Sequence, residues 1–131
     1  MQTCEIIYRV PYADTDKMGV VYYANFLVYF ERLRNELLRK LGIPYSEIEK
    51  NGVMLPVVEA VCHYKNPAYY DDLLAISGWI EEVKGPRLKI VCEVRRDATL
   101  LVSGHTVHAC VNRTGKPIRP PKEIAELSLH I

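Results

Sequence analysis

The sequence predicts an α+β fold in which one long apolar helix packs against one antiparallel sheet. A helical pattern lies near the N-terminus, the period of the apolar residues changes to two after residue 53, and short polar turns separate the later strands. A helix and a sheet each need to bury one apolar surface, and packing them together forms a single core. The 131 residues suffice for one such domain, and we place no boundary within residues 1–131.

The first predicted strand covers Glu5 to Val10 and is ended by Pro11. The helical pattern follows from about Ala24 to Leu41, with large apolar residues at spacings of three or four. Gly42 ends this helix, as glycine commonly does. The first half of the helix is apolar nearly all round, so we expect the sheet to wrap and bury it.

A short second helix is predicted where Ser46 and Glu49 have the spacing of a capping box, and Gly52 ends it. Short polar turns separate the last three strands, which should therefore form an antiparallel meander. A weak helix is predicted near the end of the chain, around Pro121 to Leu127. The four later strands are predicted at Val57–Tyr64, Leu73–Glu82, Leu88–Arg95 and Leu100–Asn112.

Charge and cysteine content exclude several classes of protein. Seventeen basic and sixteen acidic residues give a net charge of +1 without a basic run, which argues against nucleic acid as the main partner. The four cysteines lack the spacing of metal ligands. The start lacks a basic leader followed by an apolar segment, and no run approaches the roughly 18 apolar residues of a membrane span. We therefore expect a reduced, soluble, cytoplasmic protein with no integral membrane segment, no metal and no cofactor.

The segment from Asp14 to Glu31 is the most informative part of the chain. It places Asp14, Asp16 and Gly19 just before the start of the long helix. A helix start carries unpaired backbone N–H groups and a partial positive charge. A carboxylate stays ionised beside it, and the N–H groups can polarise a carbonyl oxygen. Thioester hydrolysis needs both, so the segment favours a small acyl-transferring hydrolase.

This segment, DTDKMGVVYYANFLVYFE, resembles the signature of hotdog-fold acyl-CoA thioesterases. It is most similar to the YbgC-like branch of the 4-hydroxybenzoyl-CoA thioesterase family, and the later stretch YKNPAYYDD, Tyr64 to Asp72, is similar as well. The resemblance extends from about Tyr8 to Ile124. It implies a hotdog fold, a five-stranded antiparallel sheet wrapped around one long central helix. It also implies hydrolysis of an acyl-CoA substrate to the free carboxylic acid and coenzyme A, and a homotetramer.

The resemblance further implies a catalytic site. It assigns the catalytic carboxylate to Asp16, acting as general base or as nucleophile, and the oxyanion donor to the backbone N–H of Tyr23. Many YbgC-like proteins have histidine where this chain has Tyr23. Glu31 is a third catalytic candidate, although a tether to an arginine or to a backbone N–H would explain this buried-looking carboxylate equally well. The predicted substrate-binding residues are Gly19, Tyr22 and Pro67.

Structural roles compete with several of these functional ones. Asp16 could instead cap the helix or compensate its dipole. For Asp14 a role in shaping the loop is favoured over catalysis. Asn25 is the expected N-cap of the long helix. The three histidines of the strand region are expected to be ordinary strand residues: His63, His105 and His108.

Two rival functions and the oligomeric state complete the expectations. A dehydratase or hydratase of the same fold usually relies on a histidine near the helix start, and no histidine lies between Met1 and Lys50. A non-catalytic acyl-CoA-binding or scaffold protein of the same fold is the remaining alternative. A single five-stranded sheet leaves exposed edges, so we expect sheets to pair edge to edge in a homodimer or homotetramer.

Overall fold

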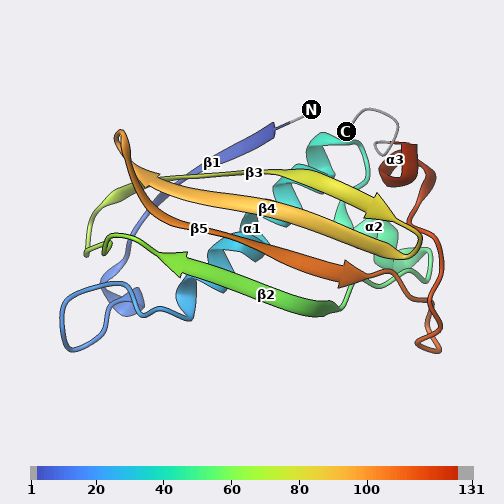
Figure 1. Cartoon of the computed structure of the whole chain (residues 1–131), viewed down its shortest axis with the longest axis horizontal. Helices are drawn as coiled ribbons and strands as arrows, with labels where there is room; N and C mark the ends of the chain where they lie inside the picture. The colour runs from blue at the N-terminus through green and yellow to red at the C-terminus, as the bar shows by residue number, and fades with distance from the viewer. Residues whose placement is uncertain (1–2, 127–131) are drawn as a thin grey trace.

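The computed structural model describes residues 3–126, in which one antiparallel sheet of five strands lies against a long helix (Figure 1). The strand order is β1-β3-β4-β5-β2, so the last three strands form the predicted meander and β1 and β2 are the two edges. The elements are β1 (Thr3–Arg9), η1 (Tyr12–Asp14), α1 (Asn25–Lys40), α2 (Tyr45–Lys50), β2 (Val57–Tyr64), β3 (Leu73–Lys84), β4 (Arg87–Arg96), β5 (Thr99–Ala109) and α3 (Lys122–Ala125).

This arrangement confirms the predicted α+β fold, with small changes in the bounds of its elements. β3 extends two residues beyond the prediction, and β5 ends at Ala109 rather than at Asn112. After Ala109 the chain turns away and makes isolated bridges from Val111 to Met54 and Pro117. α3 is shorter than the predicted helix, whose last residue lies outside the described ones. None of the helices within residues 3–126 has the length and apolar character needed to cross a membrane.

The predicted end of α1 is correct, and its geometry explains the glycine. Gly42 has φ +85°, a conformation that residues with a side chain rarely adopt. Its N–H donates to Arg39 O at 3.0 Å, and Ile43 N–H donates to Leu38 O at 3.0 Å. These two bonds form a Schellman motif, which satisfies carbonyls at the end of the helix.

The predicted capping box of α2 is wrong. The helix begins at Tyr45, its N-cap is Pro44, and none of the described side chains caps it. Proline fixes its own φ, and with Pro44 as N-cap the helix begins two residues earlier than a cap at Ser46 would place it. Ser46 therefore already lies within the first turn, whereas the predicted stop at Gly52 is confirmed by its φ of +81° and by Val53 N–H donating to Ile48 O.

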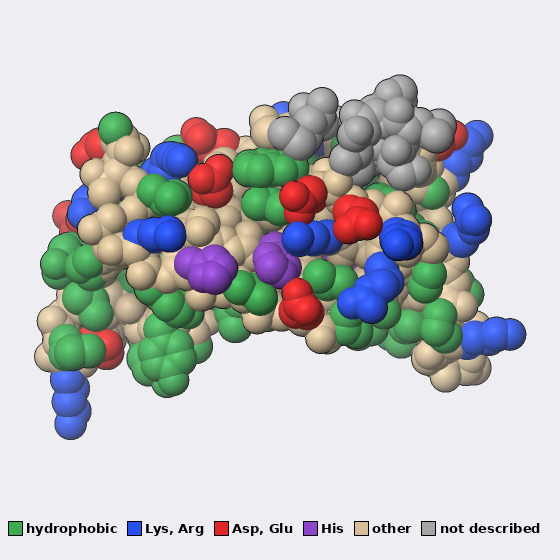
Figure 2. All heavy atoms as spheres, in the orientation of Figure 1, with side chains coloured by type: hydrophobic (Ala, Val, Ile, Leu, Met, Phe, Trp, Pro, Cys, Tyr) green, Lys and Arg blue, Asp and Glu red, His purple; other side chains and the backbone are tan. Residues whose placement is uncertain are grey.

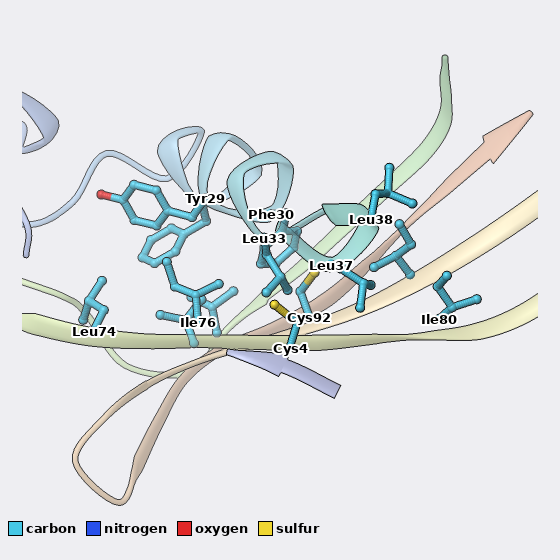
Figure 3. Packing of buried hydrophobic residues seen from close by; sticks show 14 of the residues in the cluster. Cys4, Tyr29, Phe30, Leu33, Leu37, Leu38, Leu74, Ile76, Ile80 and Cys92 are labelled. Atoms are coloured by element: carbon cyan, nitrogen blue, oxygen red, sulfur yellow. The ribbon is translucent and has the colours of Figure 1, made fainter. Parts of the chain in front are cut away.

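A row of small residues crosses all five strands under α1. Adjacent positions in the strand registers alternate between cysteine and glycine in the order Cys4, Gly78, Cys92, Gly104 and Cys62. The row leaves space for the large side chains of the helix, and Figure 3 shows Phe30 and Leu33 of α1 pointing toward Cys92 and Cys4.

The glycines of this row cannot carry a side chain. A Cβ at Gly78 would lie 2.3 Å from Leu33 Cδ2, and a Cβ at Gly104 would lie 3.0 Å from Phe30 Cε2. Both distances are shorter than ordinary van der Waals contact. The row therefore sets how closely α1 approaches the sheet.

The expectation that the sheet buries the first half of α1 on every side is wrong. The inner face is buried, but Leu27 and Val28 on the outer face are 39% and 46% exposed. One sheet covers only one side of a helix, which explains the difference. Val57 on the edge strand β2 is exposed as well, and together Leu27, Val28 and Val57 form an exposed apolar strip beside that edge.

Candidate active site

The loop before α1 is organised around Asp14. The hydroxyls of Tyr8 and Tyr29 both donate to Asp14 Oδ2, at 2.7 and 2.8 Å. The backbone N–H of Tyr22 and the side chain of Asn25 both donate to Asp14 O at 2.9 Å. Burial, and then the bond to Asp14, raises the pKa of both tyrosines, so they are neutral donors. Asp14 therefore shapes the loop, as the sequence favoured.

The start of α1 is capped by no side chain of residues 3–126. Its N-cap is Ala24, so the predicted N-cap role of Asn25 is wrong. An N-cap side chain must accept a hydrogen bond, whereas the amide of Asn25 turns back as a donor to the loop. The backbone N–H groups of residues 25–27, which follow the N-cap Ala24, donate within the first turn. In the described part of the chain, the N–H groups of Tyr23 and Ala24 donate to no hydrogen bond.

Asp16 lies half-buried in a tight turn beside this helix start. Its Oδ1 accepts the N–H of Met18 at 2.8 Å, and its main chain bonds to Val20 O and to Gly19 N–H at 2.9 and 3.0 Å. Gly19 has φ +81°, which confirms the predicted turn. Asp16 does not cap α1, so the helix-capping alternative is wrong. Its other carboxylate oxygen accepts no hydrogen bond from residues 3–126.

A cavity of about 300 Å³ lies beside the start of α1, and we call it the helix-start cavity. Two predicted site residues, Tyr23 and Pro67, line it together. Phe26 and Tyr64 supply much of its aromatic wall, and Lys65 is its one charged lining residue. The cavity is thus mainly apolar, with a few polar groups, as small-molecule sites commonly are.

The wall that contains Pro67 is held by Arg96. Its guanidinium donates from Nη1 to Pro67 O at 3.1 Å and to Asp72 Oδ2 at 2.7 Å. The same carboxylate oxygen accepts the N–H of Tyr69 at 2.8 Å. Val21 N–H donates to Ala68 O at 2.8 Å and so ties this wall to the loop before α1.

Glu31 does not join the other predicted catalytic residues. Its side chain is 62% exposed and forms an ion pair with Arg34, with Oε1 3.6 Å from Nη2. The expectation of a buried carboxylate is wrong, because Glu31 lies on the outer face of α1, whereas the tether to an arginine is confirmed. It lines a second cavity of about 350 Å³, which also includes the exposed apolar strip. Tyr22 and Gly19 line neither cavity.

The histidines agree with their expected role as ordinary strand residues. His108 is buried, with Nδ1 2.9 Å from Leu55 O and Nε2 2.9 Å from Thr106 Oγ1. Burial lowers its pKa, so the ring is neutral near pH 7. His105 Nε2 lies 2.8 Å from Glu59 Oε1.

The described residues contain no arrangement suited to a metal ion, and the face drawn in Figure 2 is not basic. No group of three or more His, Cys, Asp or Glu side chains in residues 3–126 is arranged to hold a metal ion. Figure 2 shows basic and acidic side chains mixed over the outer face of the sheet, without a continuous basic stripe on that face.

Sequence reasoning did not assign a role to Tyr64. This residue ends β2, lines the helix-start cavity and donates from its hydroxyl to Tyr23 O at 3.1 Å. Its position at the start of the matched segment YKNPAYYDD was the signal that could have drawn attention to it.

Known thioesterase-like proteins are similar to this chain over most of its length. A model of the thioesterase-like superfamily matches residues 10–127. YneP of Bacillus subtilis is 38% identical over 113 residues, which are 85% of this chain and 82% of YneP. The acyl-CoA thioesterase YbgC of Haemophilus influenzae is 37% identical over 126 residues, covering 94% and 92% of the two chains.

The fold is also that of solved thioesterases. The crystal structure of a DHNA-CoA thioesterase from Staphylococcus aureus superposes with a TM-score of 0.87 at 32% identity. The match covers 91% of this chain and 81% of that one. It confirms the hotdog arrangement that the resemblance implied.

Proposed function

The chain belongs to the thioesterase-like superfamily, and we propose that it hydrolyses an acyl-CoA thioester to a free carboxylic acid and coenzyme A. The observation that carries the proposal is the start of α1. The N–H groups of Tyr23 and Ala24, which have no partner among residues 3–126, lie there, and Tyr23 and Pro67 line the adjoining apolar cavity. The half-buried carboxylate of Asp16 lies in the adjoining turn.

In this proposal the N–H of Tyr23 donates to the thioester carbonyl oxygen. Negative charge develops on that oxygen as the carbonyl carbon becomes tetrahedral. A fixed donor at the positive end of a helix stabilises the charge without having to reorient. The role needs only the main chain, so it does not depend on a histidine at this position.

Asp16 supplies the second part of the proposed chemistry. The Met18 N–H fixes one carboxylate oxygen and leaves the other for the reaction. As a general base, Asp16 takes a proton from the water that attacks the carbonyl carbon, and the thiolate of coenzyme A leaves. As a nucleophile, it forms a mixed anhydride and expels the thiolate, and water then hydrolyses the anhydride. Both routes release the same products.

The remaining predicted residues have supporting roles in the proposal. Pro67 contributes the cavity wall that Arg96 holds in place. The turn at Gly19 and the ring of Tyr22 bind the substrate beside the helix start. Glu31 has a structural role instead, because its ion pair with Arg34 lies beside the exposed apolar strip, which a second copy of the chain would cover.

We propose a homodimer that pairs through β2. This strand is an edge of the sheet, and the side chains of Val57 and Val58 are both exposed, although neighbouring strand residues point to opposite faces. The exposed apolar strip continues this surface onto α1. Pairing of two β2 edges would satisfy their free main-chain groups and bury the strip. A tetramer would join two such dimers.

A non-catalytic acyl-CoA-binding protein is the second candidate. One observation favours it: the side chain of Asp16 does not line the helix-start cavity, and one of its oxygens already stabilises a turn. Such a protein would bind acyl-CoA in the same cavity without releasing a thiol.

The test is Asp16→Asn, with thiol release measured over a panel of aliphatic and aromatic acyl-CoAs. We expect kcat to fall by roughly 10²-fold or more, the usual loss for a positioned acid or base, while acyl-CoA still binds. The matched control is Asp71→Asn, an exposed aspartate at φ +68°, a conformation that asparagine also accepts. Unchanged turnover in Asp16→Asn would reject the mechanism. Binding without turnover by the native protein would establish the second candidate.

A further inference from the structure

Tyr64 connects the end of β2 to the start of α1, across 41 residues of sequence. Its hydroxyl donates to Tyr23 O at 3.1 Å. The main chain at Tyr64 is fixed by β5. Tyr64 pairs with Val102 of that strand, and the N–H groups of the next two residues, Lys65 and Asn66, donate to one carbonyl of β5 at 2.8 and 3.1 Å. The hydroxyl is therefore a fixed point for the main chain of the helix start.

The bond reaches a peptide group that has little other support. Within residues 3–126 the carbonyl of Tyr23 accepts one further bond, from Phe26 N–H, and that bond is long at 3.3 Å. No side chain in the described part of the chain caps the helix. Without Tyr64, the orientation of this peptide would depend mainly on the loop that precedes it.

The carbonyl of Tyr23 and the N–H of Ala24 belong to the same planar peptide group. Fixing the direction of the carbonyl therefore fixes the direction of that N–H. A hydrogen bond to the carbonyl also polarises the amide and strengthens its N–H as a donor. The N–H of Ala24 is one of the two that have no partner in the described chain.

The surroundings of Tyr64 suit a permanent donor. Its ring meets the rings of Phe26 and Tyr23 edge to face, with centroid distances of 5.8 and 6.4 Å. The pKa of Tyr64 is raised to about 12, with burial as the largest cause and the neighbouring Cys62 as the second. The hydroxyl therefore keeps its proton throughout the neutral range.

We propose that Tyr64 is a positioning residue for thioester hydrolysis, because its hydroxyl orients the Tyr23–Ala24 peptide so that the N–H groups of both residues meet the carbonyl oxygen of a substrate in the helix-start cavity. The N–H of Ala24 becomes a second oxyanion donor beside that of Tyr23. This inference rests on the proposed function.

The test is Tyr64→Phe, which removes the hydroxyl and keeps the ring. We expect kcat to fall by roughly 3- to 10-fold, the effect of one hydrogen bond on a barrier, with KM unchanged within about twofold because the cavity wall stays in place. The control is Tyr45→Phe in α2, a ring that packs on the Arg34 guanidinium and does not line the helix-start cavity. A purely structural role would instead lower the melting temperature and raise KM.

A second measurement tests directly how strongly the N–H groups at the helix start bind a substrate carbonyl. The probe is an acyl-CoA ketone analogue with CH₂ in place of the sulfur and a ¹³C-labelled carbonyl, observed by infrared difference spectroscopy. Its carbonyl stretch should move to lower wavenumber on binding to the native protein, and by less in Tyr64→Phe. An equal kcat and an equal carbonyl shift in both proteins would overturn the inference.

The inference and the function on which it rests can fail separately. Loss of thiol release in Asp16→Asn, together with native kcat and carbonyl shift in Tyr64→Phe, would leave the proposed function standing and overturn the role of Tyr64. Absence of thiol release by the native protein from every acyl-CoA tested would overturn both.

Discussion

Gly104 is the position at which one added methyl group should do most damage, and Gly104→Ala tests how the sheet accommodates α1. The new Cβ would lie 2.0 Å from the main-chain oxygen of Val61 on β2 and 3.0 Å from Phe30 Cε2 on α1. A carbon and an oxygen approach normally to about 3.3 Å. Because the obstacle on one side is main chain, no change of rotamer relieves the overlap, and β2 must move away from β5 by roughly 1 Å.

The expected cost follows from two contributions. Overpacking a well-packed core costs about 1–3 kcal/mol. Each hydrogen bond lost between β2 and β5 adds about 1 kcal/mol. We therefore expect the free energy of unfolding to fall by about 3–5 kcal/mol, a large share of the roughly 5–15 kcal/mol of a typical domain. The melting temperature should fall by roughly 10–20 °C.

The assay is urea denaturation followed by circular dichroism, together with a thermal melt. The control is Ser103→Ala, at the preceding residue of β5, whose side chain is half-exposed. Thiol release should fall as well, because β2 carries Tyr64 at its end. If the unfolding free energy of Gly104→Ala stayed within about 0.5 kcal/mol of the native value with an unchanged m-value, the close approach of β2, β5 and α1 would be refuted.

Three further predictions use other parts of the molecule. Asp14→Ala leaves the hydroxyls of Tyr8 and Tyr29 without their acceptor, so the free energy of unfolding should fall by about 2–3 kcal/mol; a smaller loss in the Tyr29→Phe background, measured by urea denaturation, would confirm the coupling. Burial depresses the pKa of His108 in the folded protein, so its contribution to stability is fully present above the unfolded pKa of about 6.5 and is lost as pH falls from there through the folded pKa; His108→Gln should flatten the pH dependence of stability between about pH 5 and 7, and an identical slope in both proteins would contradict this. Val58→Lys on the β2 edge should convert the dimer to a monomer in light scattering after gel filtration, whereas Ile7→Lys on the opposite edge, at a similarly exposed position, should leave the dimer intact; the reverse result would place the interface on β1.

Features that depend on neighbouring residues could be predicted from the sequence. The change of apolar period at residue 53 gave the order of helix and strands, and Gly42 and Gly52 gave two helix ends. The turn at Gly19 was predicted for the same reason, since a tight turn is encoded within a few residues. The sequence also pointed to two segments, one containing Asp16 and one containing Pro67, which lie at the same helix start in the structure.

Features that depend on competition between nearby partners were predicted less well. Ser46 has the spacing of a cap, but the N-cap is Pro44, so the helix begins two residues earlier. Asn25 has the side chain of a cap, but its amide is already used by a carbonyl of the preceding loop. Glu31 lies among apolar residues in sequence, yet it faces outward, because one sheet covers only one face of α1.

The sequence by itself determined the secondary-structure order, the α+β class and the segment that carries the carboxylates, because periodicity and turn chemistry act over a few residues. The tertiary structure alone decided which distant residues meet. It aligned Cys4, Gly78, Cys92, Gly104 and Cys62 in one row under α1. It also set the hydroxyl of Tyr64 on the carbonyl of Tyr23. Such contacts arise from strand register and helix packing, in which each position depends on all the strands between the two partners.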